Sequence, residues 1–382
     1  MQLRCVPWFV FSALATLAIS GLGCADDNAA DKIIDDNGRE GQRKVMAAQF
    51  QNLPTLAVDY HYDLWAVRER DVAVFVPEKG TPFRVGSFRV LDDGTAVDLS
   101  GVALPTSSNG VNFETDAELV GTGEVFVSIE PNDDAFPNVV NGPKMLSGTF
   151  ANDGALMNLD FLVRADHPSA AIVPLDQSGA FFILITPSDD TSNAVNNNNF
   201  GVHFVSASLK TGEASLLIPP SNAPNMELGT LPNSAQYEAW VVEDVNGRLA
   251  ATNGEDRSQA RFISAGTFSD PQGNAADGDG LGPQAGTDLS GAAGVPSWVG
   301  SDFVTQGPLG HGDNLTTGRW IAAISIEPVP DNDPAHPWAV LLYRQLPSGL
   351  ATGSGNVHSM QNTFDVDNHL FSPPAAVLKL LP

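Results

Sequence analysis

Four short motifs occur twice along this chain, in the same order each time. An ordered recurrence of this kind is the signature of a duplicated structural unit, so we expect two copies of the same fold along the chain. The first copies are Tyr62-Asp-Leu-Trp65, Gly86-Ser-Phe88, Asp98-Leu-Ser-Gly101 and Ser128-Ile-Glu130-Pro131. The second copies are Tyr237-Glu-Ala-Trp240, Gly266-Thr-Phe268, Asp288-Leu-Ser-Gly291 and Ser325-Ile-Glu327-Pro328. Phe83 begins the second motif in one copy and Phe262, with one residue inserted, in the other.

The segments around the motifs are short apolar runs bounded by turn residues. The chain holds 36 Gly and 27 Pro, and runs rich in Val, Ile, Phe and Ala lie between them, as at Phe83–Leu91 and Trp320–Ile326. The lengths of these runs are typical of β-strands. A helical period is not sustained over a long window anywhere, and only Val45–Gln51 has a pattern that allows a short helix. Many short strands without intervening helices predict a sandwich or barrel and not a βαβ fold.

We therefore expect an all-β fold of two tandem antiparallel β-sandwich (Ig-like) domains. The first domain is expected over residues 51–222 and the second over residues 223–382, with a loop insertion at 269–286 that makes the second copy longer. The strand-like stretch Leu156–Pro220 should complete the first domain, because a sandwich of this type needs about seven strands.

The N-terminal segment has the layout of a secretory signal peptide. Met1–Arg4 carries one positive charge, Cys5–Gly23 carries none, and Cys24 follows directly. A basic start, an apolar centre and a small-residue end predict a signal peptide over residues 1–24. Gly21-Leu22-Gly23-Cys24 resembles a bacterial lipobox, although Gly21 stands where Leu is usual. The chain has two Cys and the other lies inside the removable segment, so Cys24 is the expected lipidation site.

Plain secretion and an uncleaved membrane anchor are the alternatives, because the uncharged run is just long enough to span a bilayer. All three place the rest of the chain outside the cytoplasm, facing the periplasm or on the cell surface. Residues 25–50 begin as a polar stretch rich in Asp, Asn and Gly and are expected to form a flexible acidic tether.

The charge of the chain excludes some partners. Lys and Arg number 19 against 45 Asp and Glu, which gives a net charge of −26. Binding to nucleic acid requires a basic surface that neutralises phosphates, so no nucleic-acid partner is expected. Docking on anionic lipid through a basic patch is disfavoured for the same reason. The expected membrane contact is therefore the lipid anchor.

The order Tyr-x-x-Trp, Gly-x-Phe and Ser-x-Glu-Pro, followed by an acidic loop, resembles the extracytoplasmic C-terminal domain of the anti-sigma-K factor family. The resemblance covers roughly residues 51–150 and 230–345. It implies a β-sandwich outside the membrane. Members of that family hold a sigma factor with a separate cytoplasmic domain, and only four residues precede the apolar segment here. We therefore expect no direct binding of a sigma factor.

The repeated residues have a structural and a functional interpretation. Tyr62, Trp65 and their second copies Tyr237 and Trp240 could face a ligand, but large aromatics flanked by apolar neighbours are more often core residues. Glu130 and Glu327 each precede a Pro at an expected strand end, where a carboxylate can accept loop N–H groups or help to bind a cation. We expect all the repeated motif residues to be structural.

The remaining candidates for chemistry are acidic loops. Carboxylates that could bind calcium follow both Glu-Pro motifs and occur twice elsewhere, at Asp133-Asp134, Asp331-Asn332-Asp333, Asp189-Asp190 and Asp277-Gly278-Asp279. Turn formation is the commoner use of such residues. The seven His have no zinc-ligand spacing, and no Gly-x-Ser-x-Gly motif is present. The sequence therefore predicts no catalytic residue, metal or cofactor.

These observations favour a non-catalytic, membrane-tethered lipoprotein that binds an extracytoplasmic protein partner or senses conditions in the cell envelope. Two further hypotheses stay open. One is a surface adhesion or structural module supported by calcium, and the other is an extracellular hydrolase whose site the sequence hides.

Overall fold

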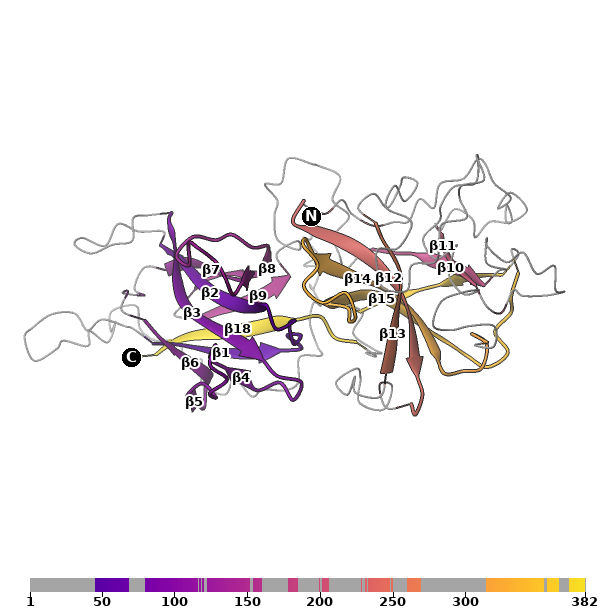
Figure 1. The fold of residues 1–382 in the computed structure, drawn as a ribbon, viewed down its shortest axis with the longest axis horizontal. Helices are drawn as coiled ribbons and strands as arrows, with labels where there is room; N and C mark the ends of the chain where they lie inside the picture. The colour runs from indigo at the N-terminus through magenta and orange to yellow at the C-terminus, as the bar shows by residue number, and fades with distance from the viewer. Residues whose placement is uncertain are drawn as a thin grey trace, which may run out of the picture.

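In the part of the chain that the computed structural model describes, every regular element is a β-strand and every strand pairing is antiparallel (Figure 1). Apart from a few isolated positions, the described residues are 45–68, 80–115, 122–151, 154–159, 178–184, 201–205, 233–247, 260–268, 314–353, 356–363 and 371–381. The predicted signal peptide with Cys24, most of the predicted tether and the insertion at 269–286 lie outside them. None of the described elements is a helix long and apolar enough to cross a membrane.

A ten-stranded sheet forms the larger part of the described structure. Its strands, in spatial order, are β4 (Ala96–Val97), β3 (Pro82–Val90), β2 (Tyr60–Arg68), β7 (Thr122–Pro131), β8 (Lys144–Thr149), β9 (Gly154–Leu159), β18 (Ala375–Leu381), β1 (Val45–Gln51), β6 (Gly110–Glu114) and β5 (Thr106–Ser107). The two ends of the sheet face each other across a core. Phe50 of β1 stacks on Phe88 of β3 with ring centroids 4.6 Å apart, and Phe113 of β6 packs edge-on against Phe88 at 5.4 Å.

Val45–Gln51 is a strand, so the short helix allowed by its sequence pattern is wrong. The segment lies between β18 and β6 and pairs with both. A seven-residue helix is marginal in isolation. A strand between β18 and β6 instead pairs its backbone N–H and C=O groups with both neighbours. Tertiary pairing therefore decides the conformation.

Two smaller sheets contain the rest of the described strands. The five-stranded sheet has the order β13 (Ala260–Phe268), β12 (Ala235–Asp244), β14 (Trp320–Pro328), β15 (Ala339–Leu346) and β17 (Gln361–Asn362). The three-stranded sheet has the order β11 (Val202–Val205), β10 (Phe181–Leu184) and β16 (Val357–Ser359).

Three strand pairings cross the boundary expected between residues 222 and 223. The C-terminal strand β18 lies between β9 and β1 in the first sheet, where Figure 1 shows it in yellow among indigo and purple strands. Strand β16 pairs with β10. The stretch expected to complete the first domain is also divided, because β9 joins the large sheet while β10 and β11 pair with β16.

Three of the four repeated motifs lie in two four-stranded units with the same strand order; Asp98–Gly101 follows β4, and its second copy at 288–291 lies outside the described residues. The first unit is β3-β2-β7-β8 and the second is β13-β12-β14-β15. Each unit has a β-bulge directly before its motif tryptophan, between Leu64 and Trp65 in one and between Ala239 and Trp240 in the other. Each also has a second irregularity directly before its motif serine, at Ser128 and Ser325. Because strand order and bulges coincide, the motif residues of the two units are equivalent in position.

The strand registers correct one detail of the sequence alignment. Phe83 pairs with Ala66, and the equivalent pair in the second unit is Ile263 with Val241. Phe262 lies one residue earlier and has a different partner. The two copies therefore have the same length here, with no inserted residue, because Phe83 corresponds to Ile263 and not to Phe262.

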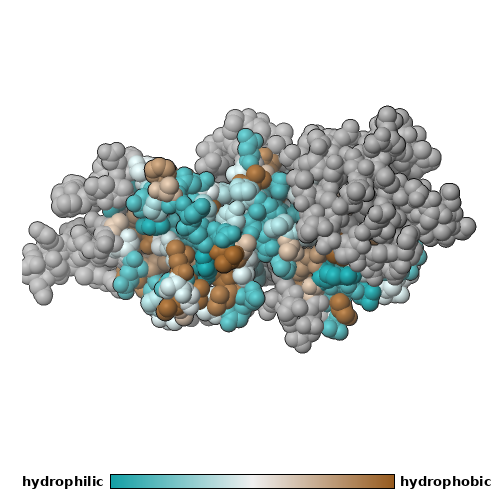
Figure 2. Space-filling view, in the orientation of Figure 1, coloured by the Kyte–Doolittle hydropathy of each residue, from teal (hydrophilic) through white to brown (hydrophobic). Residues whose placement is uncertain are grey.

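The strands that carry the motif Tyr and Trp, β2 and β12, are covered on both faces. Tyr62 and Tyr237 belong to a cluster of buried apolar side chains that includes members of both units. Trp240 points to the opposite face of its strand, into a second cluster with Ile321, Phe371 and neighbouring side chains. Where Figure 2 shows described residues at the surface, brown apolar patches are interspersed with teal polar ones.

Candidate functional site

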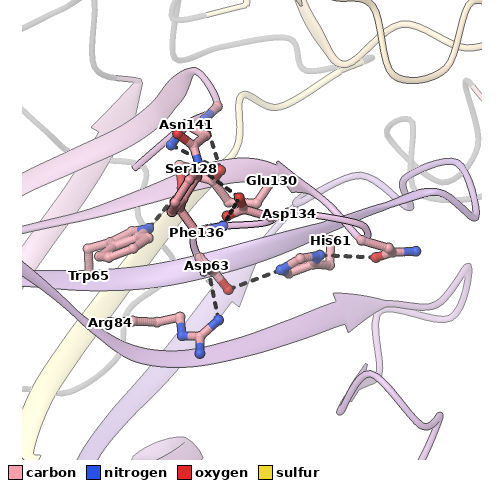
Figure 3. A network of polar contacts seen from close by, with 11 residues as sticks. His61, Asp63, Trp65, Arg84, Ser128, Glu130, Asp134, Phe136 and Asn141 are labelled. Carbon is pink, nitrogen blue, oxygen red and sulfur yellow. Dashed lines mark hydrogen bonds and ion pairs between the residues drawn. The ribbon is translucent and has the colours of Figure 1, made fainter. Parts of the chain in front are cut away.

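The first unit holds a buried chain of hydrogen bonds that starts at its motif tryptophan (Figure 3). The indole Nε1 of Trp65 donates to Ser128 Oγ across 2.8 Å, and the Ser128 hydroxyl donates to Glu130 Oε1 across 2.5 Å. The three side chains are buried. Ser128 and Glu130 are two residues apart on β7 and therefore project on the same face of the sheet. The strand register places Trp65 beside them, one strand away.

The glutamate at the end of this chain closes the loop that follows β7. Its Oε2 accepts the backbone N–H groups of Asn141 at 3.2 Å and Gly142 at 2.9 Å. A Cβ on Gly142 would lie 1.6 Å from the carbonyl oxygen of Ile129, so only glycine permits this approach. Within the loop, Asp134 Oδ1 accepts the N–H of Phe136 at 2.7 Å and the side-chain amide of Asn141 at 2.8 Å. The loop is thus held at its base and in its interior.

The second unit repeats the arrangement with equivalent residues. Trp240 Nε1 donates to Ser325 Oγ across 2.7 Å, and the Ser325 hydroxyl donates to Glu327 Oε1. Both carboxylate oxygens of Glu327 lie 3.0 Å from the backbone N–H of Trp338, which ends the loop after β14. In both copies a strand-end glutamate therefore binds its own following loop.

Burial raises the pKa of both glutamates. For Glu130, loss of solvation raises the pKa, while the Ser128 hydroxyl and the loop N–H groups oppose the rise. For Glu327 the pKa is raised more strongly, first by burial and then by the negative charge of Glu238. The charge of Asp63 also raises the pKa of Glu130, as the last of its causes, so a neighbouring acid acts in both copies and acts more strongly in the second.

In the first copy the neighbouring acid is Asp63, and two basic side chains lie beside it. Asp63 of β2 is buried, with the guanidinium of Arg84 at 3.7 Å and His61 Nε2 at 3.3 Å. The His61 contact is an ion-pair distance and does not have hydrogen-bond geometry, since Asp63 Oδ1 has no hydrogen-bond partner. The other ring nitrogen of His61 lies 3.0 Å from Asn132 Oδ1. Asp63 is therefore flanked by two groups that can carry positive charge (Figure 3).

The second copy keeps the acid and lacks both of these groups. Glu238 takes the place of Asp63, Ser264 that of Arg84, and Gln236 that of His61. The Ser264 hydroxyl donates to Glu238 Oε1, whereas the buried Oε2 has no hydrogen-bond partner. Burial and, less strongly, the charge of Asp331 raise the pKa of Glu238 to about 8, against the opposing effect of the Ser264 hydrogen bond.

The acidic loops after the Glu-Pro motifs form turns where the structure describes them. Asp331 Oδ1 accepts the N–H of Asp333 at 2.9 Å, and Asp333 Oδ1 accepts that of Ala335 at 3.1 Å. Among the described residues, no group of three or more His, Cys, Asp or Glu is placed to hold a metal ion. Asp189-Asp190 and Asp277-Asp279 lie outside these residues.

The other repeated residues shape the strands. Gly86 faces Phe113, and a Cβ there would lie 2.5 Å from the Phe113 ring. Gly266 has a φ of +112°, which favours glycine. Phe88 and Phe268 lie opposite Tyr62 and Tyr237 respectively, in stacked pairs with centroids 5.4 Å apart. Pro131 and Pro328 are the last residues of β7 and β14.

One contact between the two units has no signal in the sequence. Trp338 Nε1 donates to the Tyr62 hydroxyl across 3.1 Å, and that hydroxyl donates to the carbonyl of Pro54 across 2.8 Å. Trp338 and Tyr62 are both buried, and 276 positions separate them. Only Tyr62 belongs to a repeated motif, so neither repetition nor spacing predicts the pair.

Comparison of the chain with known protein families, with curated proteins and with solved structures finds no match.

Proposed function

We propose that this protein is a non-catalytic lipoprotein that lies outside the cytoplasm, is tethered through Cys24, and presents two Ig-like β-sandwich domains to a protein partner. The repeated Trp–Ser–Glu chains support this function because they point inward. Their donors and acceptors are satisfied by one another and by loop N–H groups. Such networks hold a scaffold in shape and leave recognition to exposed loops.

The observation that carries the proposal is the exposed tip of the loop that Glu130 closes. Phe136 is 68% exposed and Val139 is 54% exposed. Val58, 75% exposed, precedes β2 and is joined to the same loop, because Asn132 Nδ2 donates to its carbonyl across 2.6 Å. Large apolar side chains on a loop with fixed hydrogen bonds are pre-organised, so binding them costs little ordering entropy.

The charge around this tip defines the kind of partner. Asp59 and Asp133 are exposed beside the apolar side chains, and the whole chain carries a net charge of −26. Complementary charge at the rim of an interface favours encounter and rejects wrong partners. The expected partner is therefore a protein surface with an apolar pocket and a basic rim.

The resemblance of the repeated motifs to the anti-sigma-K factor family supports the extracytoplasmic sandwich assignment. It does not extend to sigma-factor binding, because the family performs that with a separate cytoplasmic domain.

A photo-reactive amino acid placed at position 136 in living cells tests the proposal. The matched control is position 245, where Val245 is 52% exposed in the turn after β12 of the second unit. We expect a discrete adduct from position 136 that is weakened by Asp133→Asn, and none of the same mass from position 245. Equal adducts from both positions would mean that the loop tip has no special role. The captured protein, once purified, provides the binding assay used below.

A further inference from the structure

The two units place a pair of carboxyl groups at the same strand positions. In the second unit Glu238 lies opposite Ser325, and Gln236 lies opposite Glu327. Glu238 and Glu327 are therefore diagonal neighbours on one face of adjacent strands, within reach of each other. Asp63 and Glu130 have the same relationship in the first unit. The first unit thus serves as an internal reference for the second.

The carboxyl pair of the second unit lacks basic partners such as Arg84 and His61, which lie beside Asp63 in the first unit. Glu238 and Glu327 are each 1% exposed, and the side chains bound to their oxygens are the hydroxyls of Ser264 and Ser325. Two buried carboxylates side by side cannot both ionise near neutral pH, because each disfavours the charged form of the other.

The charged groups on the elements packed against the pair do not supply the missing charge. The loop after β14 contributes Asp331 and Asp333, and His336 of that loop pairs with Asp333 at 3.0 Å. On β13, Arg261 pairs with Glu243 at 2.7 Å, near the other end of β12. On β15, Arg344 donates to the Ser359 carbonyl at 3.3 Å. Among the described residues, the groups that act on the pair are negative.

The pair is connected to the contact between the two units. The backbone N–H of Trp338 is bound by Glu327, and its indole N–H is bound by the Tyr62 hydroxyl of the first unit. A single residue thus links the carboxyl pair to the other unit. Any movement of Glu327 acts directly on the residue that contacts Tyr62.

We propose that protonation of the pair Glu238 and Glu327 keeps Trp338 on Tyr62, and that full ionisation of the pair loosens the contact between the two units. When both carboxyls are ionised, their repulsion drives Glu327 away from Glu238 and away from its position under Trp338. The contact between Trp338 and Tyr62 should therefore loosen as the pH rises into the alkaline range. It does not involve the Phe136 loop, so it stands or falls independently of the proposed function.

The position of Trp338 can be followed by fluorine NMR on the lipidated protein, purified in mild detergent with 5-fluorotryptophan at the five Trp positions that follow Cys24. Trp338→Phe assigns the resonance. We expect this resonance to shift between pH 6 and pH 10 in the wild type, with a midpoint at or above the pKa of about 8 for Glu238, because both carboxyls must ionise. In Glu238→Gln, which cannot ionise, the shift should be lost.

Two further variants make the result decisive. Ser264→Arg places a guanidinium where Arg84 lies in the first unit, and it should move the midpoint down by at least about one pH unit, as an opposite charge beside an acid does. Asp63→Asn, the matched change in the first unit, should leave the Trp338 titration unchanged. A Trp338 resonance that is constant across this range in the wild type overturns the proposal. So does a shift that persists with the same midpoint in both Glu238→Gln and Ser264→Arg.

Discussion

Trp65 and Trp240 occupy the same place in two separate four-stranded units, each directly after a β-bulge and each donating its indole N–H to a serine on the neighbouring strand. The distances, 2.8 Å and 2.7 Å, agree closely. A tryptophan that is buried and hydrogen-bonded in this way contributes both packing and a satisfied donor. In both copies the motif tryptophan and serine therefore stabilise the four-stranded unit.

Truncation of one of these tryptophans should destabilise the protein. Trp240→Ala removes a fully buried side chain from the cluster around Ile321 and Phe371 and leaves Ser325 without its donor. We expect a loss of about 3–5 kcal/mol in the free energy of unfolding, the usual cost of emptying such a site. Urea denaturation followed by circular dichroism measures it. Phe136→Ala, at an exposed aromatic, is the control and should change the stability by less than about 0.5 kcal/mol. Equal stabilities of the two variants would contradict a core role for Trp240.

Gly142→Ala should open the loop that Glu130 closes. The new methyl group would collide with the Ile129 carbonyl, so Gly142 must move away from Glu130 Oε2. We expect faster hydrogen exchange at the amides of residues 141 and 142 and faster proteolysis between residues 132 and 143. Gly94→Ala, where φ is +80° but space is open, tests backbone strain without a collision. Loop protection that survives Gly142→Ala would show that the Glu130 contacts do not hold the loop.

The stability of the second unit should fall as the pH rises. Burial raises the pKa of Glu238 from an ordinary value of 4.5 to about 8. Because the folded-state pKa lies above that of the unfolded chain, the stabilising effect of the proton is complete below about pH 4.5 and is lost as the pH rises through about 8. Urea denaturation at several pH values between 5 and 9 should show a decline in the wild type and a flatter profile in Glu238→Gln. Parallel profiles would mean that Glu238 does not titrate in this range.

Much of each repeated unit could be predicted from the sequence. Tyr62 and Trp65 point to opposite faces of one strand, and both faces are covered, so the flanking apolar residues were a reliable signal. The serine and glutamate two residues apart were visible as a motif as well. Their partner was not, because the bond from Trp65 to Ser128 depends on which strands become neighbours.

The rest of the structure depends on pairings between distant segments. Strand β18 pairs with β1 across more than 320 positions, from Val45 to Leu381, and no local pattern carries that information. The same pairing makes Val45–Gln51 a strand. The charge difference between the units was equally hidden, because Arg84 and Ser264 become comparable only once the registers are known.

Cys24→Ser should change where the protein is found. Without the thiol, no lipid can be attached at the predicted signal-peptide end, and the chain should be released into the soluble extracytoplasmic fraction or remain unprocessed. Fractionation followed by mass determination of the N-terminus measures this. A variant that is cleaved and stays in the membrane as before would show that another anchor is used.

The most direct test of the proposed function is the affinity of Phe136→Ser for the protein captured at position 136, measured by isothermal titration calorimetry beside the wild type. Phe136 is exposed, so the variant should keep its melting temperature. If the loop tip is the binding surface, the affinity should fall by about tenfold or more, as expected for a central aromatic in an interface. An unchanged affinity in the folded variant would contradict the proposal that this loop recognises the partner.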